Sequence, residues 1–268
     1  MRIPALLAVA LTVLPAVASE PLQGQVQDTS VVGVLKYDNN SGEERYDHLG
    51  KAFSSMMISD LSAIPRLRLI ERERIEEISA ELDLQYSGRV DEESAVSLGM
   101  IVGAQYLVLG SFITVDPEIR MNTRVARVET SEIVTTAEVT GQRDALFDLQ
   151  QRLADQIIEG LEVVLTEEER RQLSDRQEEN RIDDLDALIA YSQALCLIDD
   201  GSFVEALDVI EGAQSAAPGS RLVSATVSLL QDRAVESGRD RLTNEANRRF
   251  GGLLGRREPA PAPRRSAC

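Results

Sequence analysis

The sequence predicts an α/β fold, in which a mixed sheet is flanked by helices and is followed by a small all-α C-terminal module. In the first half of the chain, short β-branched runs alternate with amphipathic stretches of helical period, and three strand patterns then follow one another directly. The second half shows helical patterns only. A length of 268 residues suits one large domain or two small ones.

The first 18 residues have the pattern of a secretory signal peptide. Arg2 is their only charged residue, and the apolar stretch that follows is shorter than the about 20 residues that a membrane-spanning helix needs. It ends in Ala16-Val17-Ala18, the small-x-small pattern that precedes a cleavage site. We therefore expect a signal peptide over residues 1–18, a linker over residues 19–30, and export to the periplasm without an N-terminal lipid anchor or a membrane span.

The α/β unit is predicted over residues 31–165. Its first three strands are separated by helices, so we expect them to be parallel, whereas its last three are separated by short turns and form an antiparallel meander. The alternation of apolar residues slips at residues 126–128, which indicates a β-bulge. We expect Asp91 and Asp144 to cap helices. The expected strands are residues 31–35, 67–70, 106–113, 119–125 and 133–139, and the expected helices are residues 47–64, 75–84, 91–102 and 144–164.

Several small or charged residues of this unit have a structural interpretation. Gly99 and Gly103 are placed where a helix packs closely against a strand. Gly110 lies within the central strand, where we expect a covering helix to pack closely. Glu71 and Arg72 lie at a strand-to-helix junction, where either could cap the helix or form an ion pair. All five are interpreted as maintaining the fold.

Three segments of this unit together resemble the CsgG-like family, which is named for the curli secretion channel subunit of the bacterial outer membrane. They are Leu69–Ile78, Ser97–Ser111 and Ala126–Val134, which match in order the strand-to-helix junction, the glycine-rich helix-to-strand segment and the hairpin of that family. The resemblance covers residues 31–165. It implies a periplasmic core fold that is shared with lipoprotein activators of peptidoglycan synthases and with the Tol–Pal periplasmic component.

The chain departs from the channel subunit in three respects. It lacks the cysteine that carries the lipid anchor, and Ser131 stands where the hairpin turn of the family has a glycine. The channel subunit crosses the outer membrane with two long amphipathic hairpins. Here Leu35–Leu49 and Ile113–Ile133 are too short and too charged to supply about 9–11 lipid-facing residues per strand. The resemblance therefore implies the core fold without pore formation.

The second half is predicted to be helical. Thr166-Glu-Glu-Glu169 is a capping box that opens a charged helical spacer over residues 166–184. A helical module follows over residues 185–247, and the pattern from Gly201 to Pro218 resembles one tetratricopeptide repeat; a generic helical hairpin is the alternative. One repeat is too short to be stable alone, so we expect it to pack on neighbouring helices or on another subunit. Residues 248–268 hold six arginines and three prolines and form a disordered basic tail.

Composition excludes several classes of function. The net charge of −17 disfavours nucleic-acid binding. One histidine and two cysteines exclude a multi-Cys/His zinc site and a dense disulfide framework. His48 is expected at the surface and Cys196 in a helical core, while Cys268 could form an intermolecular disulfide. No catalytic motif occurs, so we predict no catalytic, cofactor-binding or metal-binding residues.

The sequence therefore predicts a non-enzymatic periplasmic protein that acts as an assembly, docking or secretion-accessory module of the bacterial cell envelope. Its partners would be envelope proteins or further copies of itself, and its basic tail could add weak electrostatic contact with the outer membrane. The alternatives are a protein-binding regulator of a cell-wall synthase and a hydrolase whose site has no recognisable motif.

Overall fold

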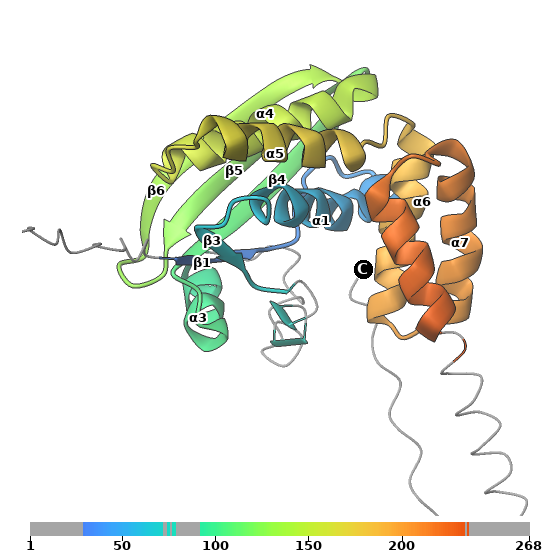
Figure 1. The fold of residues 1–268 in the computed structure, drawn as a ribbon, viewed down its shortest axis with the longest axis horizontal. Helices are drawn as coiled ribbons and strands as arrows, with labels where there is room; N and C mark the ends of the chain where they lie inside the picture. Colours follow the sequence, from blue (N-terminus) through green and yellow to red (C-terminus); the bar gives the residue numbers. More distant parts are fainter. Residues whose placement is uncertain (1–28, 72–73, 76, 79–91, 234, 236–268) are drawn as a thin grey trace, which may run out of the picture.

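The computed structural model describes residues 29–71, 74–75, 77–78, 92–233 and 235. Its sheet has the strand order β3-β1-β4-β5-β6 (Figure 1). The short β2 pairs with β4 outside this order. β1 is parallel to β3 and to β4, whereas β4, β5 and β6 form an antiparallel meander, as the sequence predicts. The strands are β1 (Ser30–Val34), β2 (Asp38–Asn39), β3 (Leu67–Leu69), β4 (Tyr106–Val115), β5 (Glu118–Arg127) and β6 (Glu132–Gln142).

Helices cover both faces of this sheet unequally. α1 (Leu49–Leu61) and α4 (Leu146–Gly160) pack on one face and bury its apolar side chains in the larger core. α3 (Glu92–Val102) packs on the opposite face, where Leu98 meets Leu107 and Leu109 of β4 in a smaller core. The helix expected over residues 75–84 lies largely outside the described residues.

The β5–β6 hairpin contains the predicted irregularity. Val125 faces Thr135 and Ala126 faces Ile133, so Val134 is the extra residue of a β-bulge. The predicted cap at Asp144 is wrong. The chain makes a 3-10 turn over Arg143–Ala145 after β6, and α4 begins only at Leu146, so its N-cap position is taken by Ala145, which has no capping side chain.

Two of the three predicted glycine contacts need correction. At Gly99 a Cβ atom would lie 2.7 Å from Val128 and 2.8 Å from Leu107, so the close approach of α3 to the sheet is confirmed. At Gly103 a Cβ atom would meet nothing within 4 Å, and its φ of +74° shows that this glycine serves the turn that ends α3. At Gly110 the close neighbour is the ring of Tyr37, at 2.2 Å from a built Cβ atom, and not a helix.

The C-terminal helices pack on the α/β unit. α5 (Glu167–Glu179) begins with the predicted capping box of Thr166 and Glu169. It is not fully solvated, because Leu173 and Gln177 on one side are buried. α6 (Leu185–Asp199), α7 (Phe203–Ala216) and a helix over residues 221–233 follow in the segment predicted to be helical.

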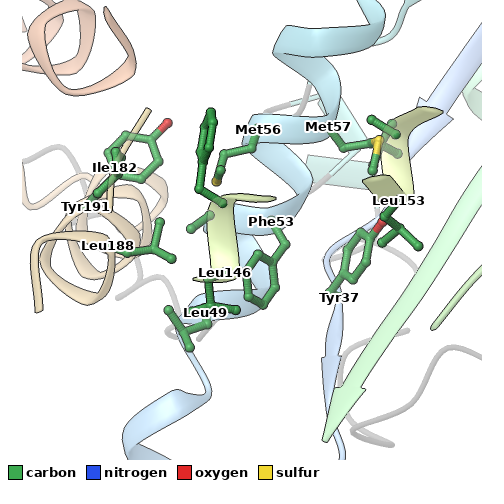
Figure 2. Close-up of a cluster of buried hydrophobic side chains, with 14 of the residues drawn as sticks. Tyr37, Leu49, Phe53, Met56, Met57, Leu146, Leu153, Ile182, Leu188 and Tyr191 are labelled. Atoms are coloured by element: carbon green, nitrogen blue, oxygen red, sulfur yellow. The ribbon is translucent and has the colours of Figure 1, made fainter. Parts of the chain in front are cut away.

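One continuous core joins the two halves of the chain. Figure 2 shows Leu188 and Tyr191 of α6 facing the side of α1 that carries Phe53 and Met56. The Tyr191 hydroxyl is 2.7 Å from the Ser55 hydroxyl of α1, a hydrogen bond in which either can donate. The helical part therefore packs on α1 of the α/β unit. This contact supplies the packing partner that a single helical hairpin needs.

Candidate functional site: an exposed face of the sheet

Strands β4, β5 and β6 bury one face and expose the other. Successive side chains of a strand point to opposite faces, and on the face of β4 turned away from α1 and α4 the last buried side chain is that of Leu109. Residues on this face are exposed except for the half-buried Ser111 and Asn122. We call it the open face, and it consists of Ser111, Ile113, Val115, Glu118, Arg120, Asn122, Arg124, Thr136, Glu138 and Thr140.

Positive and negative charges balance on the open face. The face carries two arginines, Arg120 and Arg124 of β5, and two glutamates, Glu118 of the same strand and Glu138 of β6. Arg120 Nε lies 3.7 Å from Glu138 Oε1, and both side chains are more than half exposed, so this ion pair contributes about 0–1 kcal/mol. In a chain with a net charge of −17, the open face is a region with little repulsion toward an acidic surface.

The open face also exposes apolar surface at one end. Val115 is 66% exposed and Ile113 is 37% exposed. In the β4–β5 ladder Ile113 lies opposite Arg120, and Val115 lies opposite Glu118. Two branched side chains beside charged groups resemble the mixed composition of protein-docking surfaces, in which apolar contacts are surrounded by polar ones.

The histidine singled out by the sequence lies in an internal contact. His48 precedes α1 and is half-buried, because α6 packs over it; the expectation of a surface position is wrong. The Ser192 hydroxyl donates to the backbone carbonyl of His48. The Nδ1 atom of His48 lies 3.4 Å from Cys196 Sγ. Burial is the main cause that lowers the pKa of His48. Cys196 is buried, as predicted, and is disulfide-bonded, while Cys268 lies outside the described residues.

A buried polar cluster, which was not predicted from the sequence, joins α1, α4 and α5. The carboxylate of Asp60 accepts a hydrogen bond from Gln150 Nε2 at 2.9 Å and from Gln177 Nε2 at 3.5 Å. Burial raises the pKa of Asp60 to about 6, although these hydrogen bonds oppose the rise. The available signal was position, since Asp60 follows Met56 by four residues on the apolar stripe of its helix. Asp60 is 1% exposed, so it serves packing and not surface chemistry.

A polar depression of about 320 Å³ lies between the end of α1, α5 and the helix over residues 221–233. Its side chains engage one another or their own helix: Arg221 pairs with Glu179 at 3.1 Å, and the Ser62 hydroxyl donates to the Ser59 carbonyl. The lining therefore contains no serine hydroxyl hydrogen-bonded to a side chain that could act as a general base, as a hydrolase site would need. The depression is lined by Ser62, Ala63, Gln172, Asp175, Arg176, Glu179 and Arg221.

Neither a cluster of metal-ligating side chains nor a helix that could span a membrane occurs in the described part of the chain. Across these residues, no group of three or more His, Cys, Asp and Glu side chains is arranged to hold a metal ion. Within the same ranges, no helix has the length and apolar character needed to cross a membrane.

Comparisons with known proteins agree with the predicted resemblance. Residues 16–120 match the family "Curli production assembly/transport component CsgG", which confirms the CsgG-like resemblance; the tetratricopeptide resemblance stays a prediction. The putative adenylate cyclase 3 of Rhizobium meliloti (strain 1021) is 24% identical over 218 residues, which are 81% of this chain and 35% of that protein. The chain thus spans about a third of the length of this relative.

Solved structures similar to the chain align with about half of its length. The LpoB C-terminal domain from Salmonella enterica is 17% identical and covers 45% of this chain and 87% of its own, with a TM-score of 0.37. The PelC dodecamer from Paraburkholderia phytofirmans is 16% identical and covers 52% of this chain and 91% of its own, with a TM-score of 0.33. Lipoprotein GNA1162 from Neisseria meningitidis is 11% identical and covers 51% of this chain and 99% of its own, with a TM-score of 0.35.

Proposed function

We propose that this chain, whose residues 16–120 match the CsgG family, is a non-enzymatic accessory protein of the bacterial cell envelope that docks a folded protein partner on its open face. The observation that carries the proposal is the balanced charge of this face in a chain with a net charge of −17. The family description, a curli production assembly and transport component, supports a role in the envelope. Export by a signal peptide over residues 1–18, with cleavage after Ala18, belongs to the same proposal.

Charge complementarity identifies the kind of surface that fits. Arg120 and Arg124 are exposed on the same face of β5, with the row of Asn122 between them, so the partner would present carboxylates opposite them. Ile113, which lies opposite Arg120, and Val115, which lies opposite Glu118, would meet an apolar part of the partner's surface. The other surfaces of so acidic a chain would repel such a partner, which selects the open face over them.

The shared core supports a role as a rigid platform. Because α6 packs on α1 through one continuous core, α6 and the helices that pack with it up to Leu230 are held at a fixed position relative to the sheet. The module would then bind a second envelope protein or a neighbouring copy while the open face holds the partner. The basic tail over residues 248–268 would add a salt-sensitive contact with an anionic surface.

Photo-crosslinking in the producing bacterium tests the proposal. A photoreactive residue replaces Thr140 on the open face or, as a control, Glu211 on the exposed side of α7. We expect a crosslinked partner from position 140 that is lost in the double variant Arg120→Glu/Arg124→Glu and is kept in Arg171→Glu, which reverses an exposed arginine of α5. A position-140 partner that survives the double variant, or that is lost equally in Arg171→Glu, would contradict the proposal.

The identity of the crosslinked partner separates the two envelope functions. Mass spectrometry of the product that depends on Arg120 and Arg124 would show a component of a secretion or fibre-assembly system for the function proposed here. A cell-wall synthase would assign the chain to the alternative function, regulation of that synthase.

A further inference from the structure

We infer that the outer edge of β6 accepts an extended segment of a partner protein, which continues the sheet by one strand. β6 is 11 residues long and pairs, within the described part of the chain, with β5 along one side only. Backbone N–H and C=O groups on the other side of a strand point away from its neighbour and require hydrogen-bond partners. An added strand supplies these partners, and this mode of recognition is known as β-augmentation.

The regular part of this edge is eight residues long. The bulge at Val134 disturbs the pairing near one end of β6, and residues 135–142 continue beyond it without a register shift. We call residues 135–142 the free edge. The opposite edge of the sheet is β3, which has three residues and is too short to hold an added strand.

The free edge lacks the features with which proteins protect sheet edges. Natural edges carry lysines, prolines or inward-pointing charges, or they are very short. Residues 135–142 contain no lysine, arginine or proline, and none of their inward-facing residues is charged; two of these, Ala137 and Val139, are apolar and buried under α4. The irregularity at Val134 lies outside this run. Such an edge is suited to strand addition. It carries a single charged residue, although the chain as a whole is rich in charge.

Charge identifies the added segment as basic. Glu138 is exposed at the middle of the free edge. Its Oε1 atom lies 3.7 Å from Nε of Arg120, which belongs to the neighbouring strand β5. A lysine or arginine of the added strand would flank Glu138 from the outer side as a cross-strand pair. A second copy of the chain would instead bring its own Glu138 and its net charge of −17 to the same edge. The complementary occupant is an extended partner segment that alternates basic and apolar residues.

The basic tail of the chain itself fits the free edge less well. Residues 248–268 carry six arginines, but glycines 251, 252 and 255 and prolines 259, 261 and 263 interrupt them, so the longest run without either residue has five residues. Proline cannot donate to a ladder and glycine weakens a strand. An eight-residue edge therefore favours a partner segment over the tail.

Hydrogen exchange of the mature full-length chain tests the inference with a defined probe. The probe is a seven-residue peptide of alternating lysine and valine with blocked ends, and its control is the same peptide with N-methylated valines, which keeps the charge and removes the backbone donors of one edge. We expect amide exchange within residues 135–142 to slow by about tenfold at saturating probe. The N-methylated peptide should leave the exchange unchanged. Equal effects of the two peptides, or no effect of either, would overturn the inference.

Charge variants separate this edge from the open face. Glu138→Lys should abolish the protection, whereas Glu211→Lys on α7, with the same change of charge at an exposed position, should keep it. Arg120→Glu/Arg124→Glu should also keep it, so the inference and the proposed docking function fail independently. Protection of residues 135–142 in the absence of probe would overturn the inference in favour of another occupant: the tail if deleting residues 248–268 removes it, or a second copy if it rises with protein concentration.

Discussion

Lys51 of α1 forms a buried ion pair with Asp199, the last residue of α6. The two residues are 148 positions apart in the sequence, and their side chains are 0% and 7% exposed. Burying two charges costs several kcal/mol per ion before their mutual attraction is counted, so the pair persists only where the packing around it is close. It fixes the end of α6 against α1 and with it the position of the helical part.

Removing one partner of this pair should destabilise the protein strongly. We expect Lys51→Met to lower the free energy of unfolding by about 3–5 kcal/mol, because it leaves a buried carboxylate without its cation. Lys51→Met/Asp199→Leu should recover most of this loss. Urea denaturation followed by far-UV circular dichroism measures both. Arg171→Met, which breaks the exposed pair with Glu168, is the control and should change stability by about 0–1 kcal/mol. Equal losses in the buried and exposed pairs would contradict the interpretation.

Gly110 and Tyr37 are close neighbours whose contact can be tested by overpacking. A Cβ atom at position 110 would lie 2.2 Å from the Tyr37 ring, whose hydroxyl is hydrogen-bonded to Thr123. We expect Gly110→Ala to lower the free energy of unfolding by about 1–3 kcal/mol, and Gly110→Val by more. Thermal unfolding of the two variants measures the loss.

A double-mutant cycle and a second glycine control this prediction. The loss caused by Gly110→Ala should shrink in a Tyr37→Ala background, because the ring that the new methyl group meets is absent. Gly212→Ala in α7, where a Cβ atom would meet nothing within 4 Å, should instead raise stability by about 0.8–1 kcal/mol. A loss at Gly110 that is independent of Tyr37 would show that another contact sets the cost.

The parallel and antiparallel strand pairings and the presence of most helices could be predicted because their signals are local. The capping box of Thr166 and Glu169 spans four residues, and the parallel and antiparallel pairings follow from the lengths of the connections. The two-residue strand β2 could not be predicted, since Asp38-Asn39 has turn composition and only its pairing with Ser111 and Phe112 makes it a strand.

The polar contacts inside the molecule could not be predicted because each depends on a distant residue. Asp60 meets Gln150 across 90 positions and His48 meets Cys196 across 148 positions. A charged residue on an apolar helix stripe indicates burial, but the sequence does not show which residue comes to meet it. The open face was only half predictable, since the alternation of β5 places Arg120 and Arg124 on one side, while the exposure of that side depends on where α3 ends.

Ser131 should respond favourably to the glycine that the CsgG-like family has in this turn. Its φ is +58°, in the left-handed region, and its backbone N–H donates to the Arg127 carbonyl at 2.9 Å. A side chain in this conformation costs about 1–2 kcal/mol, part of which glycine loses again through its greater freedom when unfolded. We expect Ser131→Gly to raise the thermal midpoint and Ser131→Ala not to do so. A gain in both variants would point to removal of the hydroxyl and not to relief of backbone strain.

The proposed export of the chain predicts its mature N-terminus. If cleavage follows Ala18, mass analysis of protein from the native envelope should find Ser19 at the N-terminus. Ala18→Leu places a large residue at the cleavage site and should leave uncleaved precursor, whereas Ala18→Ser should be cleaved. Met1 in the mature pool of the unaltered chain would contradict the prediction.

Asp60 should make the stability of the protein fall as pH rises from about 4 to 7. Its pKa is raised from the ordinary value of 3.8 to about 6 in the folded protein, so the folded state holds its proton more tightly than the unfolded state does. Below pH 4 the carboxyl is protonated in both states and has no effect, while above pH 6 it is ionised in both and its burial opposes folding. Each pH unit between the two pKa values corresponds to about 1.4 kcal/mol, so this contribution costs about 3 kcal/mol at pH 7.

Asp60→Asn isolates this contribution. The amide oxygen still accepts from Gln150 and Gln177, and the amide nitrogen can donate to Gln150 Oε1 or Asn180 Oδ1, which are buried without a hydrogen-bond partner among the described residues. We expect Asp60→Asn to raise the free energy of unfolding at pH 7 by up to about 3 kcal/mol and to leave it nearly unchanged at pH 4. Asp175→Asn on α5 controls for removing a negative charge from so acidic a chain. Urea denaturation at both pH values gives the comparison, and a gain at pH 7 that Asp175→Asn reproduces would assign the effect to net charge instead of burial.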